Sequence, residues 1–194
     1  MPVERIPLSP PRVALDRLAE LARAAAPSAG ATRVLAIDGR SGAGKSTLAQ
    51  ALAAEMRVPC VSLEQLYGGW DGLQAGIDRL VADVLTPLAA GRAAAVPLYD
   101  WVAARWLAPH TLQPPPLLIV VGVGAGALAA APHVGVLAWL ELPEEARMKR
   151  AMARDGSIYG GHWEMWRAQE EEYLRANRTA ERAGVILAGE SPRD

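Results

Sequence analysis

A short run of glycine, serine and lysine has the residue types and spacing of a phosphate-binding loop, Gly39-Arg40-Ser41-Gly42-Ala43-Gly44-Lys45-Ser46. Glycines let the backbone curl with its N–H groups inward, and the positive end of a following helix attracts anions. The lysine of such a loop reaches the outer phosphates, and the hydroxyl of the next residue coordinates magnesium. The run therefore predicts nucleotide binding by Gly39, Ser41, Gly42, Ala43, Gly44, Lys45, Ser46 and Thr47.

The residues on both sides of this loop supply the context that it requires. The apolar run Val34 to Ile37 precedes it, and Leu48, Leu52 and Met56 recur after it at helical spacing. A chance glycine-rich turn would not have both neighbours, so we interpret the stretch as strand, loop and helix. Asp38, at the end of the strand, is expected to accept hydrogen bonds from loop N–H groups rather than to act in catalysis.

The composition argues against several other classes of protein. The chain of 194 residues has a formal net charge of −1 with its arginines spread along it, which disfavours a nucleic acid polymer as partner. The single cysteine, Cys60, allows no internal disulfide and is expected to be a small buried hydrophobe. The N-terminus lacks the apolar core of a secretory signal. We therefore expect a cytoplasmic protein.

One uncharged stretch, residues 117–140, is long enough to be mistaken for a membrane span. Glycines and a proline divide it into two short apolar runs, which is typical of fully buried parallel strands. We therefore predict strands at 117–121 and 136–140 and no interaction with a membrane.

The other elements are predicted from hydrophobic periodicity. Helices are expected at about 9–26, 73–88, 143–155 and 163–183, and further strands at 33–37, 58–63 and 185–187. The segment from Val96 to Trp106 is predicted to be irregular. This order predicts an α/β fold, a doubly wound parallel sheet with helices on both faces, as a single domain over residues 1–194. A small helical lid is expected at about 147–162.

Beyond the loop, the chain resembles the uridine kinase-like branch of the P-loop kinases in five segments, which follow the family's order. They are 61–67, 96–101, 119–123, Arg150 with Arg154 and Asp155, and 183–187. The resemblance covers roughly residues 33–189. It implies P-loop NTPase architecture and transfer of the γ-phosphoryl group of ATP, with Mg²⁺, to a hydroxyl of a nucleoside or similar small acceptor. It leaves a homodimer open.

The resemblance also implies roles for individual residues. Glu64 stands where the family has an aspartate that serves as base and helps to hold magnesium. The implied catalytic residues are Lys45, Glu64 and Arg154, the implied metal ligands Ser46 and Glu64, and the implied acceptor contacts Tyr67, Trp70, Tyr99 and Asp100. For Trp70, Tyr99 and Asp100 a structural role fits the sequence about equally well.

Two departures from the family leave alternatives open. Val121 stands where the family has an acidic magnesium ligand, and Ala104 where it has a histidine near the acceptor. A nucleotide-binding protein that has lost turnover would fit these departures. A nucleoside monophosphate kinase is the second enzymatic alternative, because Ile37-Asp38-Gly39 before a P-loop also occurs in that group.

Overall fold

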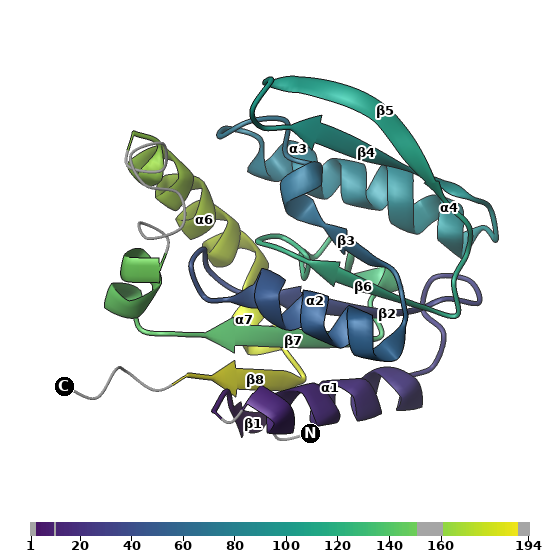
Figure 1. The fold of residues 1–194 in the computed structure, drawn as a ribbon, viewed down its shortest axis with the longest axis horizontal. Helices are drawn as coiled ribbons and strands as arrows, with labels where there is room; N and C mark the ends of the chain where they lie inside the picture. The colour runs from purple at the N-terminus through teal and green to yellow at the C-terminus, as the bar shows by residue number, and fades with distance from the viewer. Residues whose placement is uncertain (1–2, 10, 151–160, 190–194) are drawn as a thin grey trace.

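A six-stranded sheet forms the centre of the computed structural model, which describes residues 3–9, 11–150 and 161–189 (Figure 1). The order of the strands is β1–β8–β7–β2–β6–β3, and every neighbouring pair is parallel. Their bounds are β1 Glu4–Pro7, β2 Arg33–Asp38, β3 Cys60–Ser62, β6 Leu117–Val121, β7 Val136–Glu141 and β8 Val185–Ala188. The predicted doubly wound α/β fold is confirmed.

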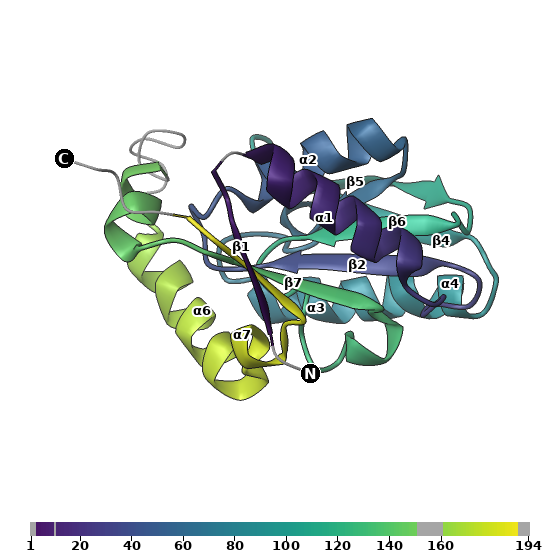
Figure 2. The same ribbon diagram turned by 90° about the horizontal axis from the view of Figure 1, so that it is seen from below.

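Helices cover both faces of this sheet because its central strands are apolar on both sides (Figure 2). In β2, Val34 and Ala36 face the core that includes the helices after β3, whereas Leu35 and Ile37 face the opposite core. The second core is covered by α1 (Pro11–Ala24) and α2 (Lys45–Met56). Because alternate side chains of β2 are buried in the two cores, the strand is held in place. The first residue of the loop that follows it is therefore held in place too.

The helical segment after β3 is confirmed in extent but is not uniformly α-helical. It consists of α3 (Leu73–Arg79), the π-helical η2 (Leu80–Leu85) and α4 (Thr86–Ala89). Pro87 has no N–H to donate, which disturbs the ordinary helical pattern just before it. Thr86 instead donates its N–H to the carbonyl of Val81, five residues earlier.

The prediction of an irregular segment from Val96 to Trp106 is wrong. β4 (Ala94–Asp100) and β5 (Arg105–Leu112) form an antiparallel hairpin, which stands apart from the six-stranded sheet beside β3 (Figure 1). Pro97 conceals the strand pattern in the sequence. It lies where the register shifts between Val96 and Leu98, a position at which a residue without an N–H is tolerated.

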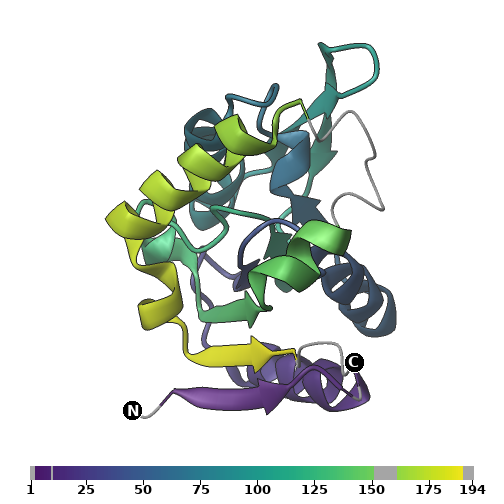
Figure 3. The same ribbon diagram turned by 90° about the vertical axis from the view of Figure 1, so that its left-hand side faces the viewer.

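At both ends of the chain, the structure differs from the prediction in smaller ways. β1 was not predicted, because it is four residues long and only Ile6 among them is buried. The single helix expected over 163–183 is two helices, α6 (Trp163–Asn177) and α7 (Thr179–Arg182), separated at Arg178 with a left-handed φ of 47°. Figure 3 shows α6 crossing the molecule from the region of the hairpin toward β8.

The predicted helix at 143–155 is helical over 144–150, where the described part ends. Residues 151–160, and with them Arg154 and most of the predicted lid, lie outside the described residues. Within the described ranges, no helix combines the length and the apolar character that crossing a bilayer requires.

Candidate functional site

The glycine-rich loop joins β2 to α2 at the carboxyl edge of the sheet, and its backbone requires glycine. Gly39, Gly42 and Gly44 have φ values of 147°, 78° and 97°, a region that side chains with a β-carbon disfavour. A β-carbon on Gly42 would lie 2.2 Å from the carbonyl oxygen of Arg147, and one on Gly39 2.4 Å from that of Leu140. The loop is therefore enclosed by the end of β7 and the segment that follows it.

The start of α2 places anion-binding groups beside this loop. The helix begins at Lys45, so the N–H groups of Lys45, Ser46 and Thr47 belong to its first turn, where α-helical partners are absent. Lys45 is only 6% exposed, and its Nζ donates to the Arg40 carbonyl at 2.9 Å. The Lys45 ammonium group therefore lies within the glycine-rich loop, in which it is predicted to reach the outer phosphates.

Asp38 accepts a hydrogen bond from the loop, as predicted, and also accepts hydrogen bonds from the segment after β6. Its Oδ1 accepts from the N–H groups of Gly39 and Gly124 at 2.6 and 3.3 Å. Its Oδ2 accepts from Gly126 N–H at 2.9 Å and the Tyr173 hydroxyl at 2.6 Å. Burial raises the pKa of Asp38, although these donors and Lys45 counteract the shift. The Asp38 carboxylate therefore accepts four structural hydrogen bonds, which fits the predicted bracing role.

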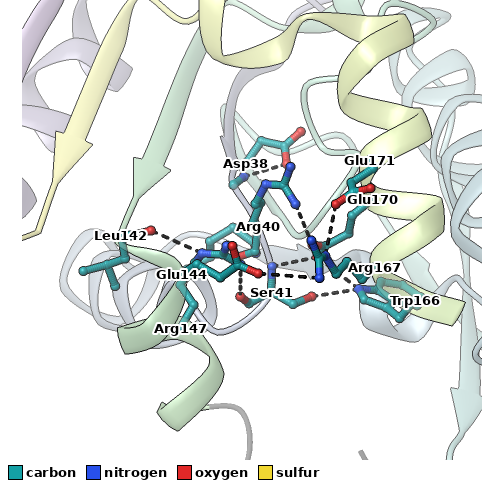
Figure 4. A network of polar contacts seen from close by, with 12 residues as sticks. Asp38, Arg40, Ser41, Leu142, Glu144, Arg147, Trp166, Arg167, Glu170 and Glu171 are labelled. Atoms are coloured by element: carbon teal, nitrogen blue, oxygen red, sulfur yellow. Dashed lines mark hydrogen bonds and ion pairs between the residues drawn. The ribbon is translucent and has the colours of Figure 1, made fainter. Parts of the chain in front are cut away.

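Ser41 is the centre of a second network, which sequence reasoning missed (Figure 4). Its N–H donates to Oε1 of Glu170 at 2.7 Å, and its Oγ accepts from Nε1 of Trp166 at 2.8 Å. Its carbonyl accepts from Arg147 at 3.2 Å. Glu170 is 2% exposed and also lies 4.0 Å from the Arg40 guanidinium. The four-residue spacing of Trp166 and Glu170 on α6 was the only hint in the sequence.

A cavity of about 310 Å³ opens next to the start of α2. It is lined by Ser46, Gln50, Cys60, Ser62, Glu64, Gln65, Tyr99, Trp101 and Val121. These residues come from α2, β3, the 3₁₀ helix η1 (Leu63–Gln65), the hairpin and the end of β6. One space therefore joins a predicted nucleotide residue, a predicted catalytic carboxylate and a predicted acceptor contact.

A larger cavity, of about 470 Å³, lies away from this loop. Its lining includes Val136 and Val185, which begin β7 and β8. Parallel α/β sheets bind ligands at the carboxyl ends of their strands, not at the amino ends. The smaller cavity beside the loop is therefore the candidate active site.

Tyr67 and Asp100 do not have the positions predicted for acceptor contacts. Tyr67 is buried in the core, 3% exposed, and its hydroxyl donates to the Val123 carbonyl at 2.8 Å. The carboxylate of Asp100 accepts from the N–H groups of Val102 and Ala103, both at 2.9 Å, and so braces the hairpin turn. Packing and turn formation account for these two residues.

The other aromatic residues divide between packing and the cavity. Trp70 stacks on His162 with ring centroids 5.0 Å apart and meets Trp101 edge to face at 5.2 Å, so it contributes to an aromatic cluster. Tyr99 lines the cavity, as does Trp101. The indole N–H of Trp101 donates to the Glu64 carbonyl at 2.8 Å. Trp101 thereby ties the hairpin to the backbone that carries Glu64.

The oxygen ligands near Ser46 suit a magnesium ion, although they are few. The Ser46 hydroxyl and Glu64 carboxylate line one cavity, and magnesium prefers such hard oxygen ligands. Val121 contributes only hydrocarbon to that lining and is 1% exposed. Among the residues that the structure describes, no group of three or more His, Cys, Asp or Glu side chains could hold a metal ion. A bound ion would therefore keep much of its water.

Cys60 and Arg150 are the remaining site residues of note. Cys60 lines the cavity and is partly exposed, and burial raises the pKa of its thiol to about 11. The thiol is therefore protonated at neutral pH.

Arg150 is exposed, but its Nη1 would lie 3.6 Å from a β-carbon on Gly44. Its guanidinium group therefore lies next to the glycine-rich loop.

Comparisons with known proteins found similarity to proteins that are named as kinases. No protein-family profile matches the chain. A bifunctional pantoate ligase/cytidylate kinase from a Synechococcus species is 43% identical over 74 residues, a match that spans 34% of this chain and 14% of that protein. The chain therefore corresponds to a small part of this curated relative.

Solved structures match over nearly the whole chain. A possible uridine kinase from Bacillus stearothermophilus has a TM-score of 0.68 and 22% identity, covering 92% of this chain and 99% of its own. A candidate fructose transport system kinase from Silicibacter sp. TM1040 has a TM-score of 0.57 and 19% identity, covering 91% and 98%. The fold is that of the P-loop kinases, as the sequence resemblance predicted.

Proposed function

We propose that this protein belongs to the uridine kinase-like branch of the P-loop kinases and transfers the γ-phosphoryl group of ATP to a hydroxyl of a small acceptor. The observation that carries the proposal is the shared cavity, where Ser46 of the loop meets Glu64 and Tyr99. Direct transfer needs donor and acceptor in one space, because the reacting oxygens must be in line. The kinase names of the structural neighbours support the same reaction class.

In this mechanism the loop binds the phosphates and Lys45 neutralises charge on the outer ones. A magnesium ion held by Ser46 and Glu64 would add positive charge that stabilises the transferring group. Glu64 orients the acceptor hydroxyl and accepts its proton as the new oxygen–phosphorus bond forms. The bond from the γ-phosphorus to the bridging oxygen breaks, and ADP leaves. Positioning provides most of the rate, since phosphoryl transfer needs little base assistance.

The acceptor is proposed to be a nucleoside or a compound of similar size. The hairpin residue Tyr99 and its neighbour Trp101 give the cavity an aromatic wall, which suits a flat or partly apolar molecule. Ala104, where the family has a histidine, is exposed at the hairpin turn with a φ of 49° and does not line the cavity. Acceptor recognition in this chain therefore depends on other residues.

A nucleoside monophosphate kinase remains the second candidate, because the local match at 43% identity is to a protein named in part as a cytidylate kinase. A nucleotide-binding protein without turnover is the third, because Val121 offers no ligand to magnesium. Both alternatives keep the phosphate-binding loop and differ in what happens to the γ-phosphate.

An ADP-release assay distinguishes these candidates. The protein is incubated with magnesium and ATP, with or without one of a panel of nucleosides, sugars and nucleoside monophosphates. The proposal predicts ADP release that depends on a hydroxyl acceptor without a phosphate. Release only with monophosphates would support the second candidate. ATP binding by calorimetry without acceptor-dependent ADP release would support the third.

A further inference from the structure

Gln65 carries a polar atom whose bonding capacity is unused. Among the residues that the structure describes, its Oε1 is the one buried side-chain oxygen or nitrogen without a hydrogen-bond partner. An amide oxygen can accept two hydrogen bonds, and leaving it buried with none destabilises the folded protein. Such a group calls for an explanation, because native structures contain few of them.

The backbone around Gln65 is held beside the cavity that its side chain lines. Gln65 ends η1, and both Leu63, which begins this short helix, and Leu66, which follows it, are fully buried. The Leu66 N–H donates to the Leu63 carbonyl at 2.8 Å, which closes the turn. Because both leucines are anchored in the core, the backbone at Gln65 has a fixed position next to the cavity.

None of the donors in the cavity wall bonds to this oxygen. Ser46, Gln50, Ser62 and Tyr99 line the same cavity and carry hydroxyl or amide groups that can donate, yet the oxygen has no partner. The indole N–H of Trp101 donates to the Glu64 carbonyl at 2.8 Å instead. A molecule bound in the cavity is therefore the natural source of the missing hydrogen bond.

We propose that Gln65 determines acceptor specificity, with Oε1 accepting a hydrogen bond from an N–H or O–H group of the bound acceptor. This group is distinct from the hydroxyl that receives the phosphate, which is the partner of the adjacent Glu64. The inference rests on the proposed kinase function and narrows its substrate class to hydroxyl compounds that carry a second donor. Sites that leave a buried polar group unpaired reject analogues without the matching donor strongly.

The test uses uridine, whose imide supplies an N–H, and 3-methyluridine, in which that hydrogen is replaced. Binding of each is measured by calorimetry in the presence of magnesium and a non-hydrolysable ATP analogue. The variant is Gln65→Met, which keeps the side-chain length and removes the oxygen. The matched control is Gln74→Met, the same change on the exposed face of α3, where Gln74 donates to Asp78 at 2.9 Å.

Gln65→Met is expected to weaken acceptor binding but to increase the stability of the folded protein. Gln65→Met should weaken uridine binding about tenfold or more and abolish the preference over 3-methyluridine. It should also raise the melting temperature of the ligand-free protein by about 2–4 °C, because an unpaired buried oxygen is replaced by apolar atoms. Gln74→Met should leave the affinity for uridine unchanged.

Two outcomes overturn the assignment of Gln65. One is that wild type and Gln65→Met bind the two compounds with the same affinities. This includes the case in which neither protein binds either compound. The other is a lower melting temperature in Gln65→Met, which would identify Gln65 as a structural residue. Failure of the kinase proposal looks different: the wild type would bind uridine through Gln65 but release no ADP. Conversely, acceptor-dependent ADP release that Gln65→Met does not alter would retain the kinase and discard this inference.

Discussion

The two sides of the candidate active site differ in how fully their polar groups are bonded. On the phosphate side, Asp38, Ser41 and Lys45 all have internal partners, and Glu170 and Arg147 reach the loop from distant helices. On the acceptor side, Gln65 has a buried oxygen with no partner. The side chains that brace the loop are therefore bonded without ligand, whereas the Gln65 oxygen on the acceptor side is proposed to gain its bond only when a ligand binds.

The two sides also differ in what supports them. The loop arises from β2, at the centre of the sheet, whereas Tyr99 and Trp101 come from a hairpin that pairs only with itself. The hairpin is held by aromatic contacts, such as the Trp106 ring, which lies 4.5 Å from the Arg79 guanidinium carbon. Changes on the phosphate side should therefore affect donor binding and stability, and changes on the acceptor side should affect mainly the acceptor.

The largest expected effect is that of Lys45→Ala on turnover. Loss of the ammonium group removes charge stabilisation at the outer phosphates, so kcat/KM should fall by about 10²–10³-fold, with weaker ATP binding. The loop amides and the core remain, so the fold should persist. Calorimetry with ATP, ADP-release kinetics and circular dichroism measure the three quantities. Unchanged ATP affinity in a folded variant would rule out the loop as the nucleotide site.

Asp38→Asn should mainly reduce stability. Its amide group can replace only one carboxylate oxygen, so at least one buried donor, such as the Gly126 N–H, loses its acceptor. The cost is about 1–3 kcal/mol, or a fall in melting temperature of roughly 2–10 °C. Tyr173→Phe removes a single donor to Asp38 and should lower the melting temperature less. Thermal denaturation of both variants is the measurement, and equal melting temperatures for Asp38→Asn and wild type would contradict the bracing role.

Trp101→Phe tests the acceptor side. The change removes the indole N–H that binds the Glu64 carbonyl and leaves an aromatic ring in the hairpin. A lost hydrogen bond of about 0.5–1.5 kcal/mol should lower kcat/KM for the acceptor roughly threefold to tenfold, with little change in ATP affinity. Trp106→Phe, in the same hairpin but outside the cavity, is the matched control. Equal kinetics for the two variants would show that Trp101 does not position Glu64.

Val121→Glu is expected to have the smallest effect. It would reduce the difference between the two sides because it adds a charged group to the cavity. It adds an acid at the end of β6, where magnesium could offset the cost of burying the charge. The magnesium concentration for half-maximal turnover should fall by a few-fold, measured by titration of activity. Without the ion, the glutamate is a buried unpaired charge and should lower the melting temperature. A variant that melts lower with and without magnesium and ATP, and gains no activity, would show that Val121 is only a core residue.

Contiguous residues were sufficient to predict the glycine-rich loop and the strands beside it. The loop conformation depends on glycines within one short segment, and β2 and β6 are apolar runs whose burial follows from their composition. The role of Asp38 was also predictable, because one of its partners is the next residue along the chain. These features are local, so their physical cause is contained in the sequence around them.

Long-range packing decided the rest. Tyr67 and Tyr99 are both tyrosines in segments that resemble one family, yet Tyr67 is buried against Val123 and Tyr99 lines the cavity. Likewise, nothing near Ser41 in the chain indicates Glu170, which is 129 positions away and meets it only because α6 crosses the loop. The sequence by itself determined the glycine-rich loop and the strands that support it. The tertiary structure alone decided which side chains complete the site, because a side chain's exposure and partners depend on which distant elements pack against it.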